Sequence, residues 1–167
     1  MRIIRLLTTA DPVFPVLCAW YGAWLGEVNG ETAEETAQTM GRSLNAGRLP
    51  QTFVAMEGAT PLGMYQLAMA DDLTTRPDLY PWLINVYVAP LYRGRRVFRQ
   101  MMESVPGNAR AAGLTELWLY TEHEGLYEKF GWEFCGTAER FRPVRETVRL
   151  YRLNICGAAG ETVPCEI

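Results

Sequence analysis

The sequence predicts an α+β fold, in which a mixed central β-sheet carries helices on both faces. Segments with strand and helix periodicity follow one another in the order βααβββαβαββ. The 167 residues are 49% hydrophobic, enough to bury one core without a metal or disulfide staple. No internal repeat or linker interrupts them. We therefore expect a single domain over residues 1–155, followed by a flexible Gly- and Ala-bearing tail over 156–167.

The first half of the chain contains two helical segments flanked by strands. Asp11 and Pro12 form a helix start signal, and acids at the start of the second helix complement the positive end of its dipole. A short polar segment between two strand-like runs predicts a hairpin. The expected elements are a strand over 2–7, a helix over about 13–28, a helix from Glu31 to about Asn45, and strands at TFVAM (52–56) and PLGMYQLAMA (61–70).

The second half begins with PWLINVYVAP (81–90), which is bounded by prolines and rich in β-branched and aromatic residues, so it is expected to be a central strand. Helical spacing runs from Arg95 to Ala112, where Pro106 should kink or split the helix. The remaining expected elements are a strand at LWLY (117–120), a short helix over 123–130 and an antiparallel pair, 132–141 with 146–155.

The composition disfavours several classes of function. The net charge is −3 and the chain has a single lysine, so no basic field for binding nucleic acid is expected. No segment is long and apolar enough for a signal peptide core or a membrane span. One histidine and four cysteines without C-x-x-C spacing predict no metal site. We expect reduced thiols in a cytoplasmic protein at Cys18, Cys135, Cys156 and Cys165.

The most informative segment is YRGRRVFRQM, where a strand runs into a helix. A helix start presents unpaired backbone N–H groups and a positive dipole end, which together bind phosphate. Arg93, Arg95 and Arg96 add charged donors, and Gly94 lets the main chain approach an oxyanion closely. The pattern favours a pyrophosphate ligand, although an isolated R-G-R-R is also typical of a solvated basic loop.

The wider context resembles a known family. VYVAPLYRGRRVFRQMM, followed by LWLYTEHEGLYEKFGW, is similar to the acetyl-CoA core of the GNAT superfamily of N-acetyltransferases. That core has a strand ending V-x-P, the loop [QR]-x-x-G-x-[GA], a helix, a strand and Y-x-x-x-G-[FW]. DDLTTRPDLYPWL further resembles a bacterial branch of the superfamily. The resemblance implies the GNAT fold and acetyl-CoA as acetyl donor, with no metal.

The resemblance also implies roles for individual residues. The cofactor-binding positions are Val86, Val88, Arg93, Gly94, Arg95, Arg96, Val97 and Phe98. The strand backbone at Val86 would hold the thioester oxygen, and the N–H groups of residues 94–98 would hold the pyrophosphate. Tyr127 matches the tyrosine that protonates the leaving thiolate. This chain departs from the pattern at Arg96, which replaces a glycine, and at Phe98, which replaces a small residue.

No general base follows from the motif. The family position that often carries a glutamate falls at or near Trp82, and residues 80–88 contain no carboxylate. A base acting through water remains open, as does an ordinary surface role for every candidate. The candidates are Glu27, Asp71, Asp72, Glu122 and Glu124, together with the only histidine, His123, one helical turn before Tyr127.

The predicted function is acetyl transfer to a primary amine of a small cationic or neutral molecule. Trp20, Tyr21 and Trp24 either line an acceptor pocket or belong to the core, and Asp71, Asp72 and Asp78 either attract a cationic amine or form a solvated loop. Alternatives are a non-catalytic CoA-binding sensor and an enzyme acting on a protein or peptide amine. The partners expected are an amine acceptor, no nucleic acid and no membrane, and a homodimer stays open.

Overall fold

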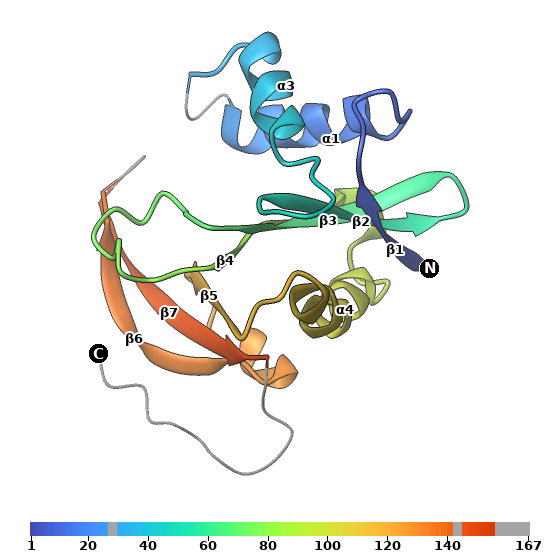
Figure 1. The fold of residues 1–167 in the computed structure, drawn as a ribbon. Coiled ribbons are helices and arrows are strands. Elements are labelled where there is room, and N and C mark those ends of the chain that lie inside the picture. The colour runs from blue at the N-terminus through green and yellow to red at the C-terminus, as the bar shows by residue number, and fades with distance from the viewer. Residues whose placement is uncertain (27–29, 142–144, 156–167) are drawn as a thin grey trace. The chain divides into compact units, whose positions relative to one another are not determined.

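A computed structural model describes residues 1–26, 30–141 and 145–155 (Figure 1). The chain forms two compact units. The first combines residues 1–67 with 85–104, and the second combines 68–84 with the chain from Val105 onward. Two elements, β4 and α4, pass from one unit into the other. The expectation of one domain over 1–155 stays a prediction.

The element order agrees with the expected βααβββαβαββ, with a 3-10 helix as its last helical element. The hydrogen-bonded strand order is β1-β2-β3-β4-β5-β7-β6, with β4 parallel to β5, so the predicted mixed sheet is confirmed. The elements are β1 (Arg2–Leu6), α1 (Phe14–Tyr21), the π-helix η1 (Gly22–Gly26), α3 (Ala33–Gly41), β2 (Gln51–Glu57), β3 (Thr60–Ala68), β4 (Trp82–Val88), the 3-10 helix η2 (Pro90–Tyr92), α4 (Val97–Ala111), β5 (Glu116–Thr121), the 3-10 helix η3 (Tyr127–Phe130), β6 (Glu133–Arg140) and β7 (Glu146–Asn154).

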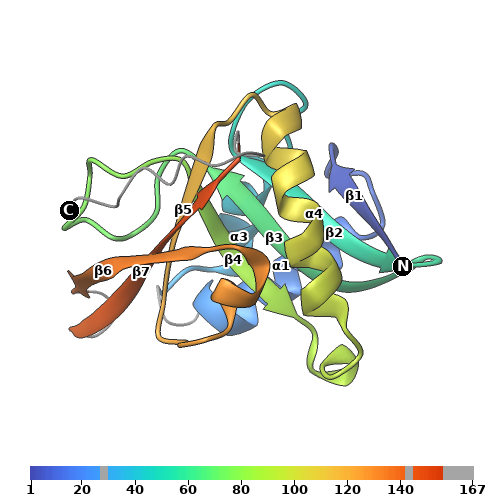
Figure 2. The same ribbon diagram turned by 90° about the horizontal axis from the view of Figure 1, so that it is seen from below.

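In the first unit, helices cover both faces of the antiparallel strands β1, β2 and β3. Figure 1 shows α1 and α3 on one face and α4 on the other, and Figure 2 shows α4 crossing β2 and β3. Side chains of β3 alternate between these layers. Met64 packs with Leu17 and Met40 of the helical pair, whereas the Tyr65 hydroxyl lies 2.9 Å from Ser104 Oγ of α4.

The two helices of the first unit are shorter than expected. A capping box starts α3, because Glu35 N–H donates to Thr32 Oγ1 (3.2 Å) and Thr32 N–H donates to the Glu35 carboxylate (2.8 Å). The helix ends at Gly41 rather than near Asn45, whose side-chain amide instead donates to the carbonyls of Arg42 and Pro50. The first helix becomes the π-helix η1 after Tyr21, and its expected end at residue 28 lies outside the described residues.

The second unit contains the antiparallel ladder β5-β7-β6 and the first residues of β4. Trp82 pairs with Trp118 across the parallel contact, and the Trp82 indole N–H donates to Leu79 O (2.7 Å). Both tryptophans belong to a buried cluster with Val148 and Leu150 of β7. The beginning of β4 is therefore anchored in this core through Trp82.

Two helix predictions for the second half are wrong. The helix expected over 95–112 is not split at Pro106, because α4 runs without interruption from Val97 to Ala111. Its buried face outweighs the roughly 3 kcal/mol that an interior proline costs, since Met101, Val105 and Ala109 are fully buried. The helix expected over 123–130 is reduced to η3. His123 therefore does not lie one helical turn before Tyr127.

The cysteines partly contradict the expectation of reduced thiols. Cys18 is a free thiol, whereas Cys135 is disulfide-bonded, so the prediction is wrong at Cys135. Cys156 and Cys165 lie outside the described residues. Within the described part of the chain, none of the helices has the length and hydropathy needed to cross a membrane.

Candidate functional site

The end of β4 is held close to β3 at a glycine. A Cβ atom on Gly63 would lie 2.6 Å from the carbonyl oxygen of Tyr87 and 3.0 Å from Met101 Sδ, so no larger residue fits there without movement. Just beyond, Ala89 N–H donates to Leu62 O at 3.0 Å. The strands β3 and β4 are therefore in close contact near Val86 and Val88, the positions at which the family resemblance predicts thioester binding.

The stretch Asn85–Val88 differs from the start of β4. Trp82 and Leu83 are buried, whereas residues 85–88 are each half-buried. Asn85 also has a positive φ of 53°, in the left-handed region that interrupts regular strand geometry. Its side chain donates to Gln66 Oε1 at 2.6 Å. Sequence periodicity marks this stretch only as a strand and gives no sign of the irregular residue.

The basic loop connects β4 to α4 through two residues of positive φ. Gly94 has φ 76° and Arg96 has φ 63°. Arg96, which replaces the glycine of the family pattern, therefore keeps the backbone conformation that glycine adopts most easily. Arg93 Nε donates to Val88 O at 3.1 Å, and the Arg95 guanidinium lies over the Tyr92 ring at 5.6 Å. The loop is thus fastened to the strand that it follows.

The sequence predicts that the backbone N–H groups of residues 94–98, at the start of α4, bind an anion. The Arg95 N–H donates to Tyr92 O at 3.4 Å, so it is engaged within the loop itself. The N–H groups of Gly94, Arg96 and Val97 have no hydrogen bond to another described residue. Val97 is buried and Phe98 half-buried, while the loop residues 93–96 are exposed. A 15-residue helix with an exposed start and unengaged N–H groups can bind an anion.

Tyr127 belongs to the second unit, where it opens η3 and is buried. Its ring contacts Trp132 edge-on at a centroid distance of 6.1 Å and lies 6.4 Å from the Tyr151 ring. This burial raises the pKa of Tyr127 to about 12, because the phenolate would lose its hydration. The side chain stays protonated throughout the physiological range, as a proton donor must.

The acidic loop after β3 forms a cluster that sequence reasoning did not assemble. The Tyr120 hydroxyl donates to the Asp72 carboxylate, and Arg140 Nη1 donates to the Tyr120 oxygen at 3.2 Å. Arg140 also pairs with Glu146. Burial, with the adjacent Asp72 charge, raises the pKa of Asp71 to about 7 despite the opposing Asp72 N–H bond and Arg140 charge. A carboxyl group with this pKa suits proton transfer near neutrality.

The raised pKa of Asp71 predicts a pH-dependent stability. Because the native state holds this proton more tightly, the stability due to Asp71 is present below about pH 4 and lost as pH rises through 7. We expect Asp71→Asn to gain stability relative to the parent protein between pH 5 and pH 8, measured as urea midpoints. Asp78→Asn is the control, since Arg76 lowers the pKa of Asp78 out of that window. Equal gains in both variants would refute the assignment.

Several of the other base candidates have contacts of their own. Glu124 pairs with Arg149 at 3.6 Å, and the backbone N–H of His123 donates to Thr121 Oγ1 at 3.1 Å. Glu122 is exposed, and Glu27 lies outside the described residues. Asp78, which is not a base candidate but one of the acids that could attract a cationic amine, accepts two hydrogen bonds from Arg76.

The aromatic residues of the first helix fall into two groups. Tyr21 is buried in the core with Leu17 and Met40, as a purely structural residue would be. Trp20 and Trp24 instead contact the Tyr87 ring of β4, at centroid distances of 5.4 and 5.7 Å. Trp24 is 40% exposed. An aromatic surface therefore adjoins the strand that carries Val86 and Val88.

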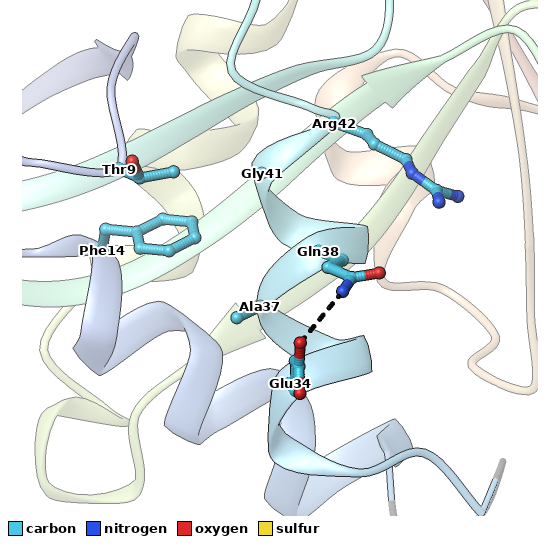
Figure 3. A pocket seen from close by; sticks show the side chains of 7 residues that line it. All are labelled: Thr9, Phe14, Glu34, Ala37, Gln38, Gly41 and Arg42. Carbon is cyan, nitrogen blue, oxygen red and sulfur yellow. Dashed lines mark hydrogen bonds between the residues drawn. The ribbon is translucent and has the colours of Figure 1, made fainter.

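A shallow pocket in the first unit involves none of the predicted cofactor residues. Figure 3 shows its lining from α3, the start of α1 and the preceding loop: Thr9, Phe14, Glu34, Ala37, Gln38, Gly41 and Arg42. The Gln38 amide donates to Glu34, one turn earlier in α3. Among the described residues, no group of three or more His, Cys, Asp or Glu side chains is placed to hold a metal ion.

Comparison with known proteins agrees with this architecture. A family model for an acetyltransferase (GNAT) domain matches residues 32–135. An aminoglycoside 6'-N-acetyltransferase complexed with coenzyme A aligns at 13% identity and a TM-score of 0.73, covering 96% of this chain and 100% of the other. The aminoglycoside 6'-N-acetyltransferase from Enterococcus faecium gives the same values.

A third similar structure acts on a different substrate. The ribosomal-protein-alanine N-acetyltransferase from Brucella melitensis aligns at 18% identity and a TM-score of 0.67, covering 92% of this chain and 99% of that one. A search of curated protein sequences gives no match. At these identities the structural similarities establish the fold, while the family match rests on the sequence.

Proposed function

Because the chain belongs to the GNAT acetyltransferase family, whose members take the acetyl group from acetyl-CoA, we propose that it acetylates the primary amine of a small cationic or neutral molecule. Acetyl-CoA is the donor, and family membership argues against the alternative of a non-catalytic sensor. The observation that carries the site assignment is the loop at the start of α4. Gly94 and Arg96 both have positive φ there, and neighbouring N–H groups are unengaged.

The proposed donor site uses the backbone more than the side chains. The N–H groups of Gly94, Arg96 and Val97 hold the CoA pyrophosphate at the positive end of α4. The strand backbone at Val86 and Val88 holds the acetyl carbonyl and the pantetheine arm, and Phe98 adds apolar contact. A backbone N–H directed at the thioester oxygen stabilises the negative charge that develops there during attack, by about 3 kcal/mol.

The proposed reaction is direct transfer between the two bound substrates. The amine nitrogen attacks the thioester carbon, forming the C–N bond and giving a tetrahedral intermediate whose collapse breaks the C–S bond. The leaving thiolate takes the proton of the Tyr127 hydroxyl, and the proton lost by the amine passes through water to a base.

Two observations support a small amine as the acceptor. The rings of Trp20, Trp24 and Tyr87 offer an aromatic surface that attracts cations, beside the proposed acetyl position. Two similar structures act on aminoglycosides, which are small amines. A protein N-terminus is the second candidate, favoured by the similarity to a ribosomal-protein-alanine N-acetyltransferase. The cytoplasmic location, bacterial source and homodimer stay predictions.

Calorimetric titration followed by an acceptor screen tests the proposal. We expect the purified protein to bind acetyl-CoA with micromolar affinity, and Arg93→Ala to bind it more weakly, because Arg93 ties the loop to Val88. Aminoglycosides, polyamines, amino acids and peptides are then offered as acceptors, with thiol release as the readout. Absence of acetyl-CoA binding would overturn the donor assignment, and turnover with peptides alone would select the second candidate.

A further inference from the structure

A buried polar network lies beneath the middle of β4. Gln66 on β3 is only 4% exposed, and its side-chain amide donates to Ser43 Oγ and Thr52 Oγ1, both at 2.8 Å. Ser43 Oγ donates to Met40 O and lies 2.6 Å from Thr52 Oγ1. Asn85 completes the network from β4 by donating to Gln66 Oε1 at 2.6 Å. All five residues belong to the first unit.

Counting hydrogens leaves one arrangement for this network. The single hydroxyl hydrogen of Ser43 is used on Met40 O, so Ser43 Oγ can only accept from Gln66 and Thr52. Gln66 Nε2 donates to Ser43 and Thr52 and has Met40 Sδ as a further acceptor at 3.7 Å, so the amide nitrogen faces this cluster and Gln66 Oε1 is turned toward β4. Asn85 must present a donor to that oxygen. The network thus fixes the orientation of the Asn85 side chain.

The orientation of Asn85 matters because its backbone is the irregular point of β4. Asn85 has φ 53°, and asparagine tolerates this left-handed conformation better than most residues. The dihedral angles of residue 85 set the direction of the peptide that follows it, including the N–H of Val86. Holding the side chain therefore holds the direction of that N–H.

We propose that Asn85 is a positioning residue, which the Gln66 network holds in a left-handed conformation so that the Val86 N–H meets the acetyl carbonyl. The inference rests on the proposed function, since it concerns the same thioester. It assigns to Gln66, Ser43 and Thr52 a task beyond core packing, namely recognition of the acetyl group as distinct from the rest of CoA.

The test compares two ligands that differ in one oxygen. Acetyl-CoA has the thioester carbonyl, and S-ethyl-CoA lacks it, so the ratio of their dissociation constants reports the carbonyl contact alone. We expect the wild-type protein to bind acetyl-CoA about fivefold more tightly than S-ethyl-CoA, as for one hydrogen bond. Asn85→Asp should bring the ratio near one, because a carboxylate oxygen would face Gln66 Oε1. Asn85→Gly, which permits the conformation without the side-chain bond, should also lower the ratio.

A matched control separates positioning from general stability. Tyr65→Phe removes the hydroxyl contact with Ser104 from the neighbouring residue of β3, whose side chain faces α4. This variant should keep the wild-type ratio even if its melting temperature falls. If Asn85→Asp does not fold, Asn85→Gly decides. The inference would be overturned if the wild-type protein bound the two ligands equally well, or if folded Asn85 variants kept the ratio of the wild-type protein. Failure of the wild-type protein to bind either ligand would instead overturn the proposed function.

Discussion

Replacing Tyr127 with phenylalanine should lower kcat by about 100-fold and leave the dissociation constant of acetyl-CoA almost unchanged. The substitution removes the proton offered to the leaving thiolate, and general acid catalysis contributes at least about 100-fold in most enzymes. The aromatic ring, which packs against Trp132 and Tyr151, is retained. Steady-state kinetics with the best acceptor from the screen and calorimetry with acetyl-CoA measure the two quantities separately.

The control for this variant is Tyr151→Phe. Tyr151 lies beside Tyr127, but its hydroxyl is engaged with Glu128 at 2.6 Å and with Arg149 at 3.0 Å. We expect that variant to keep its kcat. Because the pKa of Tyr127 is about 12, the wild-type pH profile should show no loss of activity from Tyr127 ionisation below pH 11. Undiminished turnover in Tyr127→Phe would refute the acid role.

The second large effect is expected at Arg96, where stability and binding should change in opposite directions. A residue other than glycine at φ 63° costs about 1–2 kcal/mol, so Arg96→Gly should raise the free energy of unfolding by up to about 1 kcal/mol. The same change removes an exposed guanidinium from the proposed pyrophosphate loop. Loss of one charge-assisted contact should weaken acetyl-CoA binding about tenfold.

Arg99→Ala is the control for the loss of one positive charge. Arg99 lies in the first turn of α4, after the loop that contains Arg96, and it pairs with Glu103 at 3.7 Å. Its replacement therefore removes a positive charge without changing a residue of positive φ. Chemical denaturation and calorimetry should show a much smaller effect on binding for this variant than for Arg96→Gly. Tighter binding by Arg96→Gly would mean that the arginine side chain crowds the phosphates and does not bind them.

Local patterns predicted the parts of the fold that depend on local chemistry. The two strand-like runs at 52–56 and 61–70, separated by a short polar segment, form the expected hairpin, and the prolines bounding PWLINVYVAP mark both ends of β4. The R-G-R-R segment lies at the start of α4 with unengaged N–H groups, as its position between strand and helix predicts. In each case neighbouring residues alone decide the structure.

Features that depend on distant partners were not accessible from the sequence. From the sequence, Asn85 is an ordinary strand residue. Its special role depends on the hydrogen bond that its side-chain amide donates to Gln66, which lies 19 positions earlier in the chain. The pKa of Asp71 depends on burial that no local pattern encodes. Pro106 by itself favours a split helix, because the burial of Met101 and Val105 that keeps α4 continuous is tertiary. Helix propensity along the sequence includes the cost of the proline but not the tertiary burial that outweighs it.

The interleaving of the two compact units limits how such a protein can be re-engineered. Each unit is built from two separate stretches of chain, which alternate at Leu67, Ile84 and Ser104. The aromatic surface around Tyr87 and the loop of residues 93–96 belong to one unit, and Tyr127 belongs to the other. A chimera with a single crossover would always take part of one unit from each parent. To give this protein the acceptor preference of a relative, residues 1–67 and 85–104 would therefore have to be replaced together.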